Sequence, residues 1–298
     1  MRLSRIILAT TLCVSLLSPA TVFAGPGADT AEDIGVYFEP AGSFFFRNTL
    51  DTGGVDAQAF ISPNAGFIQI AGDWDGDGDD GIGIYDTTTG GFFLVDTVSD
   101  SPGAPLASDY SFFLATDGAN WLPIAGDWDG VGGDGVGIYN TTSGAMFLVD
   151  DATATGGVAV ASDYSLFMSP DGANHLPLAG AWNGAANDGV GIYNTTSGTM
   201  FLADNANVTG GAFVGADETI FIDPAGANYR PVAGDWNDNG SDGVGIFSTT
   251  SGAFFLVNDA TQGPGAAAPT DITASMIGSV SPLGGAGYLP VTGYWGLP

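Results

Sequence analysis

The sequence predicts an all-β fold in which five copies of a four-stranded unit form a closed ring. Tryptophans recur about every 54 residues, and short β-branched or aromatic runs between them are bounded by Gly, Asn, Asp and Thr-Ser-Gly turns. No helical period follows the first 24 residues. A repeat of this length with four strands per copy is typical of a β-propeller blade. The repeated tryptophans are Trp74, Trp128, Trp182, Trp236 and Trp295.

Each unit offers four hydrophobic runs, which we name strands A to D in chain order. Strand A resembles PIAGDW, B resembles VGIY, C resembles AMFLV and D resembles SLFMS. The small residues of A and B suit inner strands that crowd a central axis. The predicted A strands lie near 69–74, 123–128, 177–182, 231–236 and 289–295.

The first 24 residues have the pattern of a signal peptide. Arg2 and Arg5 precede the apolar run Ile6–Leu17, and Val22-Phe23-Ala24 has the small-residue form of a cleavage site. We therefore expect residues 25–298 to form one exported propeller domain, secreted, held at the cell surface or in a periplasm. The single cysteine, Cys13, lies in the leader, so no disulfide is expected.

The two ends of the mature chain complement each other. The chain finishes on LPVTGYWGLP, a strand A with nothing after it, and residues 34–63 supply B, C and D with no A before them. Joined, they make a fifth blade that closes the ring and removes two exposed sheet edges. The alternative is an open stack whose ends pair with neighbouring molecules and build a fibre.

The charge balance excludes several partners. The chain has 33 Asp and Glu against 4 Lys and Arg, and its formal net charge is −29. Such a surface repels nucleic-acid phosphates and anionic lipids, so neither nucleic acid nor membrane insertion is expected. Calcium loading and a saline habitat are both consistent with this acidity.

An acidic phrase, GDWDGDGDDG, joins strands A and B of the first unit. Acids at alternate positions followed by glycine form the oxygen cage that a hard cation needs, which predicts Ca²⁺ there. The third unit keeps Asn183 but has Ala181 and Ala185, so no site is expected in it. The candidate ligands are Asp73, Asp75, Asp77, Asp79 and Asp80 in the first unit, Asp127, Asp129 and Asp134 in the second, and Asp235, Asn237, Asn239 and Asp242 in the fourth.

One acid of this loop is constant in all four continuous units. It persists in the third unit, where the other acids are gone, so it is expected to hydrogen-bond the loop backbone as well. The position is occupied by Asp80, Asp134, Asp188 and Asp242.

The phrase GDWDGDGDDGIGIY resembles the calcium loop of FG-GAP/VCBS-type repeats, the blades of integrin-α-like propellers, in secreted bacterial versions. The resemblance extends over all five units. It implies a propeller, Ca²⁺ in the A–B loops and a role in adhesion or ligand binding, with Asp73, Asp75 and Asp77 binding through side chains and Asp79 through its carbonyl. The family's last acid usually falls at loop position 9, whereas Asp80 is at position 8, and such propellers commonly have seven blades.

The D–A loops lie on the face opposite the A–B loops, and each ends in one ring. An aromatic platform beside an amide can hold a sugar by stacking and hydrogen bonding, but packing between blades at the start of strand A is the favoured role of these rings. The candidate ligand-binding residues are Phe67, Trp121, His175, Tyr229 and Tyr288, with Asn120, Asn174 and Asn228.

The residues favour a binding module over an enzyme. The mature chain has no Cys or Lys and one His, His175, without an evident catalytic partner. We expect an extracellular calcium-binding adhesion module that binds a glycan or a surface protein and is monomeric or weakly self-associating. The most specific version of this hypothesis is a lectin-like ring of carbohydrate-binding sites. A structural surface, matrix or fibre protein is the alternative, and a glycosidase using paired carboxylates is a remote one.

Overall fold

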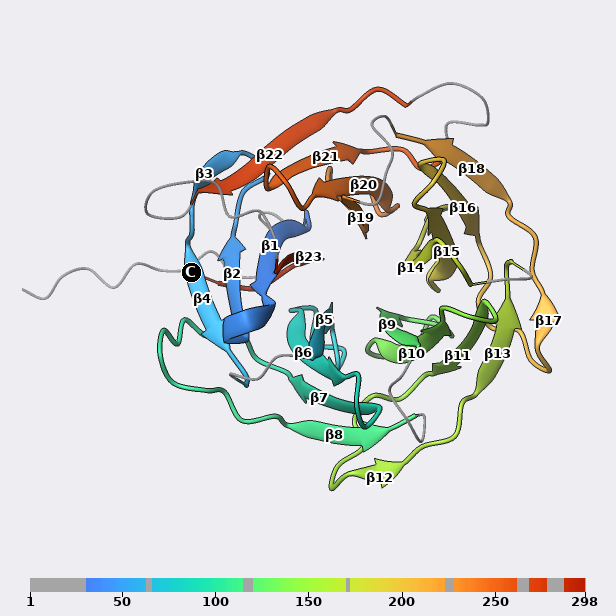
Figure 1. The fold of residues 1–298 in the computed structure, drawn as a ribbon, viewed down its shortest axis with the longest axis horizontal. Helices are drawn as coiled ribbons and strands as arrows, with labels where there is room; N and C mark the ends of the chain where they lie inside the picture. Colours follow the sequence, from blue (N-terminus) through green and yellow to red (C-terminus); the bar gives the residue numbers. More distant parts are fainter. Residues whose placement is uncertain are drawn as a thin grey trace, which may run out of the picture.

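The described part of this computed structural model forms five sheets arranged around a central opening (Figure 1). It comprises residues 31–62, 66–114, 120–169, 172–222, 228–261, 268–277 and 287–297, so the expected leader (residues 1–24) lies outside it. Within these ranges the helical structure is one 3-10 turn, Glu39–Ala41. None of the described helical structure is long and apolar enough to cross a bilayer. The fold is an all-β, five-bladed propeller.

Blades one to four are each built from one continuous stretch of chain. Blade one contains β5 (Phe67–Gly72), β6 (Gly81–Asp86), β7 (Gly91–Val95) and β8 (Tyr110–Phe113). Blade two contains β9 (Trp121–Gly126), β10 (Gly135–Asn140), β11 (Ala145–Val149) and β13 (Tyr164–Phe167). Blade three contains β14 (His175–Gly180), β15 (Gly189–Asn194), β16 (Thr199–Ala203) and β18 (Glu218–Phe221). Blade four contains β19 (Tyr229–Gly234), β20 (Gly243–Ser248), β21 (Ala253–Val257) and β22 (Ile272–Ile277).

Blade five joins the two ends of the chain, as the sequence predicts. It contains β23 (Tyr288–Gly293), β1 (Asp33–Phe38), β2 (Ser43–Arg47) and β4 (Ala57–Phe60) in that order. The last strand, β23, pairs antiparallel with the first, β1, from Asp33 opposite Gly293 to Phe38 opposite Tyr288. The ring therefore closes within one chain, and the open stack does not describe this protein.

The inner strands begin and end about two residues earlier than expected. In blade one, β5 ends at Gly72, and Trp74 follows it as a buried residue that is 2% exposed. Its indole packs on the start of β6, where a Cβ on Gly81 would come within 2.5 Å of the ring. The tryptophan, together with the carbonyl oxygen of Val95, thus explains why a glycine precedes the run Ile82–Tyr85.

Five hydrophobic cores hold the ring together, one at each interface between adjacent blades. Between blades one and two, for example, Trp74 and Phe92 share a core with Ile138. Each repeated tryptophan belongs to one of these cores and is at most 3% exposed. Large buried side chains contribute about 1.5–3 kcal/mol each, so the blade interfaces dominate the stability of the ring.

The long segments that join strands C and D contain more than irregular loop structure. Three of them contain short strands, β12 (Val158–Ala159), β17 (Ala212–Phe213) and β3 (Thr52–Gly54). These strands pair in parallel with β8, β13 and β22, the outer strands of the preceding blades. Each added strand covers a sheet edge that would otherwise present unpaired backbone groups.

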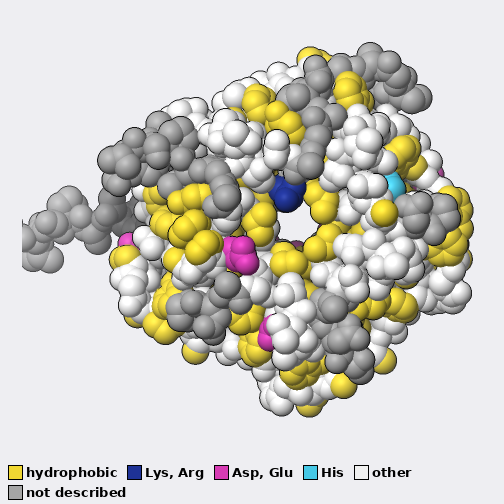
Figure 2. All heavy atoms as spheres, in the orientation of Figure 1, with side chains coloured by type: hydrophobic (Ala, Val, Ile, Leu, Met, Phe, Trp, Pro, Cys, Tyr) yellow, Lys and Arg dark blue, Asp and Glu magenta, His cyan; other side chains and the backbone are white. Residues whose placement is uncertain are grey.

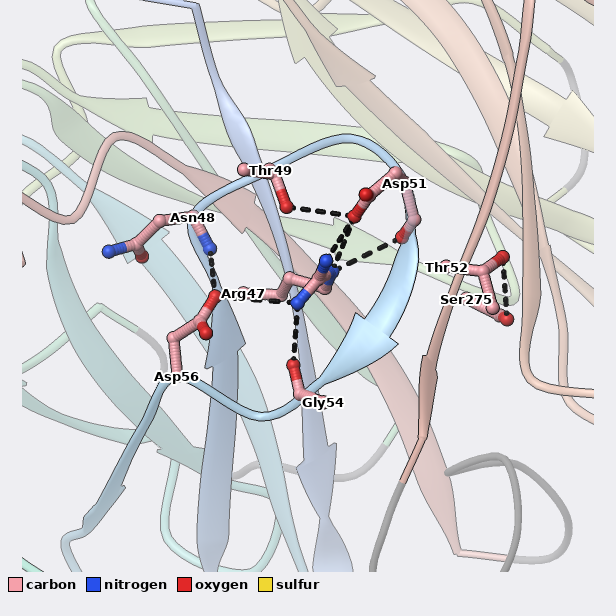
Figure 3. A network of polar contacts seen from close by, with 8 residues as sticks. All are labelled: Arg47, Asn48, Thr49, Asp51, Thr52, Gly54, Asp56 and Ser275. Atoms are coloured by element: carbon pink, nitrogen blue, oxygen red, sulfur yellow. Dashed lines mark hydrogen bonds and ion pairs between the residues drawn. The ribbon is translucent and has the colours of Figure 1, made fainter.

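Arg47 organises the C–D segment of blade five (Figure 3). Its guanidinium forms an ion pair with Asp51, and its Nη1 donates to the carbonyl oxygen of Gly54 at 2.8 Å. The segment folds around the arginine and places Thr52 beside Ser275 of β22, where the two hydroxyl oxygens lie 3.2 Å apart. The role of Arg47 is therefore structural.

We expect Trp295→Ala to destabilise the closed ring by about 3–5 kcal/mol, because it empties a large buried site in the core that joins blades five and one. Urea unfolding of the full chain measures this loss. Phe213→Ala is the control, since Phe213 is 59% exposed and its truncation should change the free energy of unfolding by less than about 1 kcal/mol. Equal effects of the two substitutions would contradict the assigned core.

Candidate metal centre and the opposite loop face

The A–B loop of blade one brings three carboxylates together. Asp73, Asp75 and Asp77 each offer an oxygen, and these atoms lie within 4.8 Å of one another. Among the described residues, they form the only group of three His, Cys, Asp or Glu side chains that could share a metal ion. Asp73 is half-buried, whereas Asp75 and Asp77 are exposed.

Backbone amides hold this loop in its curved form. Asp73 Oδ1 accepts hydrogen bonds from the amides of Gly76 and Asp77 at 2.8 and 3.1 Å, and Asp73 Oδ2 accepts one from Gly78 at 3.0 Å. Gly76 and Gly78 have φ angles of 77° and 95°, which residues with a side chain rarely adopt. The glycines of the phrase therefore set the curvature that lets the acids converge.

Asp96, at the end of β7, lies beside this cluster and was missed by the sequence analysis. Burial, together with the negative charges of Asp75 and Asp77, raises its pKa to about 6. The signal was present in the sequence, because an acid or amide follows strand C in every unit. The equivalent residues are Asn48, Asp150, Asp204 and Asn258.

The other A–B loops keep the curvature and lose acids. In blade two, Asp127 and Asp129 accept amides as their counterparts do, but the third position is Val131, which is 76% exposed. In blade four, Asp235 accepts the amides of Asn239 and Gly240 at 3.0 and 2.7 Å. The metal sites predicted in blades two and four therefore have the fold of the loop without a cluster of three carboxylates.

The constant aspartate hydrogen-bonds to the neighbouring blade and so links the two blades. We had expected its hydrogen bond to be with the backbone of its own loop. Asp134 of blade two accepts the amide of Asp73 in blade one at 3.0 Å, and Asp80 accepts the amide of Tyr294 in blade five at 2.7 Å. Asp188 and Asp242 make the same bond to Asp127 and Ala181. None of these four aspartates belongs to the carboxylate cluster. Asp80 therefore has a different role from Asp73, Asp75 and Asp77, with which we had grouped it as a candidate metal ligand.

Glu32 takes the fifth place in this set of clasps. Its own amide donates to the carbonyl oxygen of Asp235, and its carboxylate lies against Gly234, where any Cβ would collide with it. The sequence analysis missed Glu32 because the loop of blade five is cut and the residue is a glutamate. We call Glu32, Asp80, Asp134, Asp188 and Asp242 the clasp carboxylates.

Burial raises the pKa of every clasp carboxylate. The pKa reaches about 7 for Asp80, about 8 for Asp188 and about 6 for Asp242. For Glu32 and Asp134 it also lies well above the ordinary value, and the other clasp carboxylates add to the effect of burial. Burial and repulsion between these carboxylates therefore favour their protonated, neutral forms.

The rings on the D–A face occupy the first position of each inner strand. All five are half-buried, and Phe67, Trp121, Tyr229 and Tyr288 pack against the cores between blades. Trp121 meets Phe147 edge to face with ring centroids 5.8 Å apart. His175 Nε2 lies 3.2 Å from Nδ2 of Asn194. Each ring thus has a packing role and still presents part of its surface to solvent.

The neighbouring asparagines have a backbone role. Asn120 and Asn174 adopt φ angles of 63° and 62°, the left-handed region that Asn tolerates best after glycine. The carbonyl oxygens of Asn120, Asn174 and Asn228 accept the amides of Thr141, Thr195 and Thr249, each at 2.8 Å. Their side chains are on exposed residues and can also reach a ligand.

No protein-family model and no curated protein matches the chain, so the resemblance to FG-GAP/VCBS repeats stays a prediction. Solved structures give weak matches. A Bacteroides caccae protein of unknown function aligns at 9% identity and a TM-score of 0.41, over 76% of this chain and 69% of that one. An Agrocybe aegerita lectin that recognises non-reducing terminal N-acetylglucosamine aligns at 12% identity and a TM-score of 0.33, over 78% and 75%.

We expect Asp188→Asn to stabilise the protein at pH 8.5 by at least about 1 kcal/mol. A carboxylate with a raised pKa favours folding when protonated, so its contribution is present below about pH 4 and is lost as the pH rises through about 8. The asparagine keeps an oxygen for the amide of Asp127 without the charge. Urea unfolding at pH 5 and 8.5, with calcium chelated, measures the difference.

Asp217→Asn is the matched control for this substitution. Asp217 also accepts a backbone amide, that of Asp204 at 3.0 Å, but it is exposed. Its replacement should change stability by similar amounts at the two pH values. An Asp188→Asn gain that is no larger at pH 8.5 than at pH 5 would contradict the electrostatic cost assigned to the clasp.

Proposed function

We propose that this protein is an exported calcium-binding propeller that acts as a binding or adhesion module. The observation that supports it best is the convergence of Asp73, Asp75 and Asp77 within 4.8 Å. At an effective dielectric constant of about 20, two carboxylates about 5 Å apart repel each other by roughly 3 kcal/mol, which a bound cation removes. Carboxylate oxygens are the ligands that Ca²⁺ prefers.

The surroundings of the cluster fit a calcium ion. Asp96 adds a fourth carboxylate from the corner after β7, and its pKa is raised by burial and then by the charges of Asp75 and Asp77. When bound, Ca²⁺ would neutralise these acids and tie the A–B loop to that corner. Asp73 and its amide donors keep the loop curved, while Asp79 is proposed to bind through its backbone carbonyl.

We propose glycans as the ligands of the D–A face. Figure 2 shows this face, on which hydrophobic and uncharged polar side chains predominate and acidic ones are few. Five half-buried rings at equivalent positions around it offer stacking surfaces, and repetition gives weak sites avidity. Neutral sugars suit such a face better than polyanions do, given the net charge of −29.

Binding rather than catalysis follows from the same residues. Many of the described acids are occupied in the carboxylate cluster, in the clasps or in accepting backbone amides. The proposal therefore assigns the module a partner outside the cell, a glycan or a surface protein, and no chemical step.

Ca²⁺ should raise the melting temperature of the full chain, because a ligand that binds only the native state stabilises it. Asp75→Ala should weaken calcium binding at least about tenfold by removing one carboxylate ligand. Isothermal titration calorimetry measures the affinity. Asn183→Ala, at the equivalent position of blade three, is the control and should leave it unchanged. A melting temperature that is insensitive to chelator would exclude the calcium site.

Trp121→Ala and Tyr229→Ala should each reduce binding on a glycan array, since each removes a stacking surface from the D–A face. Phe213→Ala provides the control, because Phe213 is an exposed ring at the outer edge of blade two. Circular dichroism confirms that the variants fold. Absence of binding to every glycan by the wild-type chain would reject the lectin form and leave the calcium proposal intact.

A further inference from the structure

A cleft of about 260 Å³ lies at the junction of blades three and four, on the face that carries the A–B loops. Blade three contributes Asn183 from its A–B loop, together with the buried Trp182. Blade four contributes the remaining wall from its own A–B loop and from the corner after β21. The polar residues of that wall are Asn239, Ser241, Asp242, Asn258, Asp259 and Thr261. The cleft is therefore lined mainly by amide and hydroxyl side chains.

Three amides meet in this cleft at positions that hold other residues elsewhere in the ring. The positions are the residue after the repeated tryptophan of one blade, the third residue after the tryptophan of the next blade, and the residue after strand C of that next blade. Here they are occupied by Asn183, Asn239 and Asn258. Between blades one and two they are Asp75, Val131 and Asp150, and between blades two and three Asp129, Ala185 and Asp204.

The exchange of acids for amides changes what the cleft can bind. The blades fold and pack with two acids and one apolar residue at these positions, so the fold does not require three amides. An ionised carboxylate only accepts hydrogen bonds, whereas an amide both donates and accepts them. The first set suits a cation, and the second suits a neutral ligand that carries hydroxyl groups.

Hydrogen bonds within the loops orient two of the amides. Asn183 Oδ1 accepts the backbone amide of Ala185, and Asn239 Oδ1 accepts that of Ser241, each at 2.8 Å. Because the oxygens are used in this way, each side chain keeps its Nδ2 as a donor for a ligand.

Asn258 presents a buried polar atom without a partner. Its backbone amide donates to Asp271 Oδ2 at 2.9 Å, but its own Oδ1 is buried and accepts no hydrogen bond from a described group. Oδ1 of Asp150 and of Asp204 is buried in the same way, but there it belongs to a carboxylate, which a cation can satisfy. The neutral amide oxygen of Asn258 needs a hydrogen-bond donor, and a ligand hydroxyl would supply one.

We propose that this cleft binds one ring of a neutral sugar. A sugar hydroxyl donates and accepts at the same time, so the three amides and the Ser241 hydroxyl match several hydroxyls around one ring. Asp259 Oδ1 accepts the amide and the hydroxyl of Thr261 at 2.8 and 2.6 Å, which leaves Oδ2 to accept another. A volume of about 260 Å³ is just below the range of about 300–1,000 Å³ that drug-sized ligands occupy, and it suits a single ring.

This site is separate from both sites proposed above. Of the described residues that line the cleft, none belongs to the D–A face, and the carboxylate cluster lies in blade one. The inference therefore goes beyond the glycan proposal for the D–A face and does not depend on it.

Saturation-transfer NMR and calorimetric titration of the full chain, with calcium chelated, test the site. The probes are the methyl glycosides of D-glucose, D-galactose, D-mannose and L-fucose. We expect at least one of these four neutral glycosides to bind.

Substitutions taken from other blades remove the amides and keep residues that the loops already accommodate. Asn239→Ala introduces the residue of blade three, and Asn258→Asp introduces that of blades two and three. Each should weaken glycoside binding about fivefold or more, because each removes a donor from the cleft. Asn237→Asp is the matched control, since Asn237 lies in the same loop as Asn239 but outside the lining of the cleft, and it should leave binding unchanged. The melting temperature of each variant confirms that it folds.

Three results would overturn the inference: no binding of any of the four glycosides, undiminished binding by either cleft variant, or a calcium-binding event that either variant abolishes, which would make the cleft a cation site. Binding that Trp121→Ala abolishes and both cleft variants retain would assign the sugar to the D–A face. That result would reject this site and support the earlier proposal, so the two can be told apart.

Discussion

One hydrogen bond, found at four of the five blade junctions, underlies many other features of this propeller: the carboxylate of one blade accepts the first amide after strand A of the preceding blade. Asp134 makes it to Asp73 at 3.0 Å. The carboxylate lies so close that a Cβ on Gly72 would approach it to 2.7 Å, which explains the glycine that ends each inner strand. The amide is turned away from its own sheet, so the clasp satisfies a group that would otherwise be buried without a partner.

The clasp also divides the A–B loop into two parts with different electrostatics. Toward the axis, the carboxylates have raised pKa values because burial and mutual repulsion disfavour their charged forms. On the outer side, Asp75 and Asp77 are exposed, and water or a cation can solvate them. Loss of the outer acids in blade three leaves its clasp intact, which is why Asp188 persists beside Ala185. The loop can therefore gain or lose a metal without losing the ring.

The sequence predicts the ring well because every blade repeats the same tryptophan, strand and turn patterns. Trp74 and its four counterparts predict the number of blades, and the strand B near the start with the strand A near the end predicts the closure, which the pairing of β23 with β1 confirms. Features seen only once, or built from weak patterns, were missed. β12 is two exposed residues, Val158–Ala159, whose strand character comes from pairing with β8 and not from their own pattern. Glu32 departs from the aspartate of the other loops, so only its place against Gly234 reveals it.

A ring of near-identical units makes its exceptions informative. The same backbone position occurs in five blades. Where four blades have the same kind of residue, that residue shows what the fold requires, and a different residue in the fifth blade indicates an additional constraint. At the third position of the inner strands proline is tolerated in four blades, since these strands are sheet edges that face the channel. Gln69 and Arg230 are the exceptions at the third and second positions, and each donates a hydrogen bond to a backbone carbonyl oxygen, that of Pro290 and that of Tyr229. The rings of the D–A face differ in kind, because every blade has one and four of the five, all except His175, pack against a core between blades. Packing accounts for the recurrence of these rings. Any ligand binding by them depends on the part of each ring that packing leaves exposed to solvent.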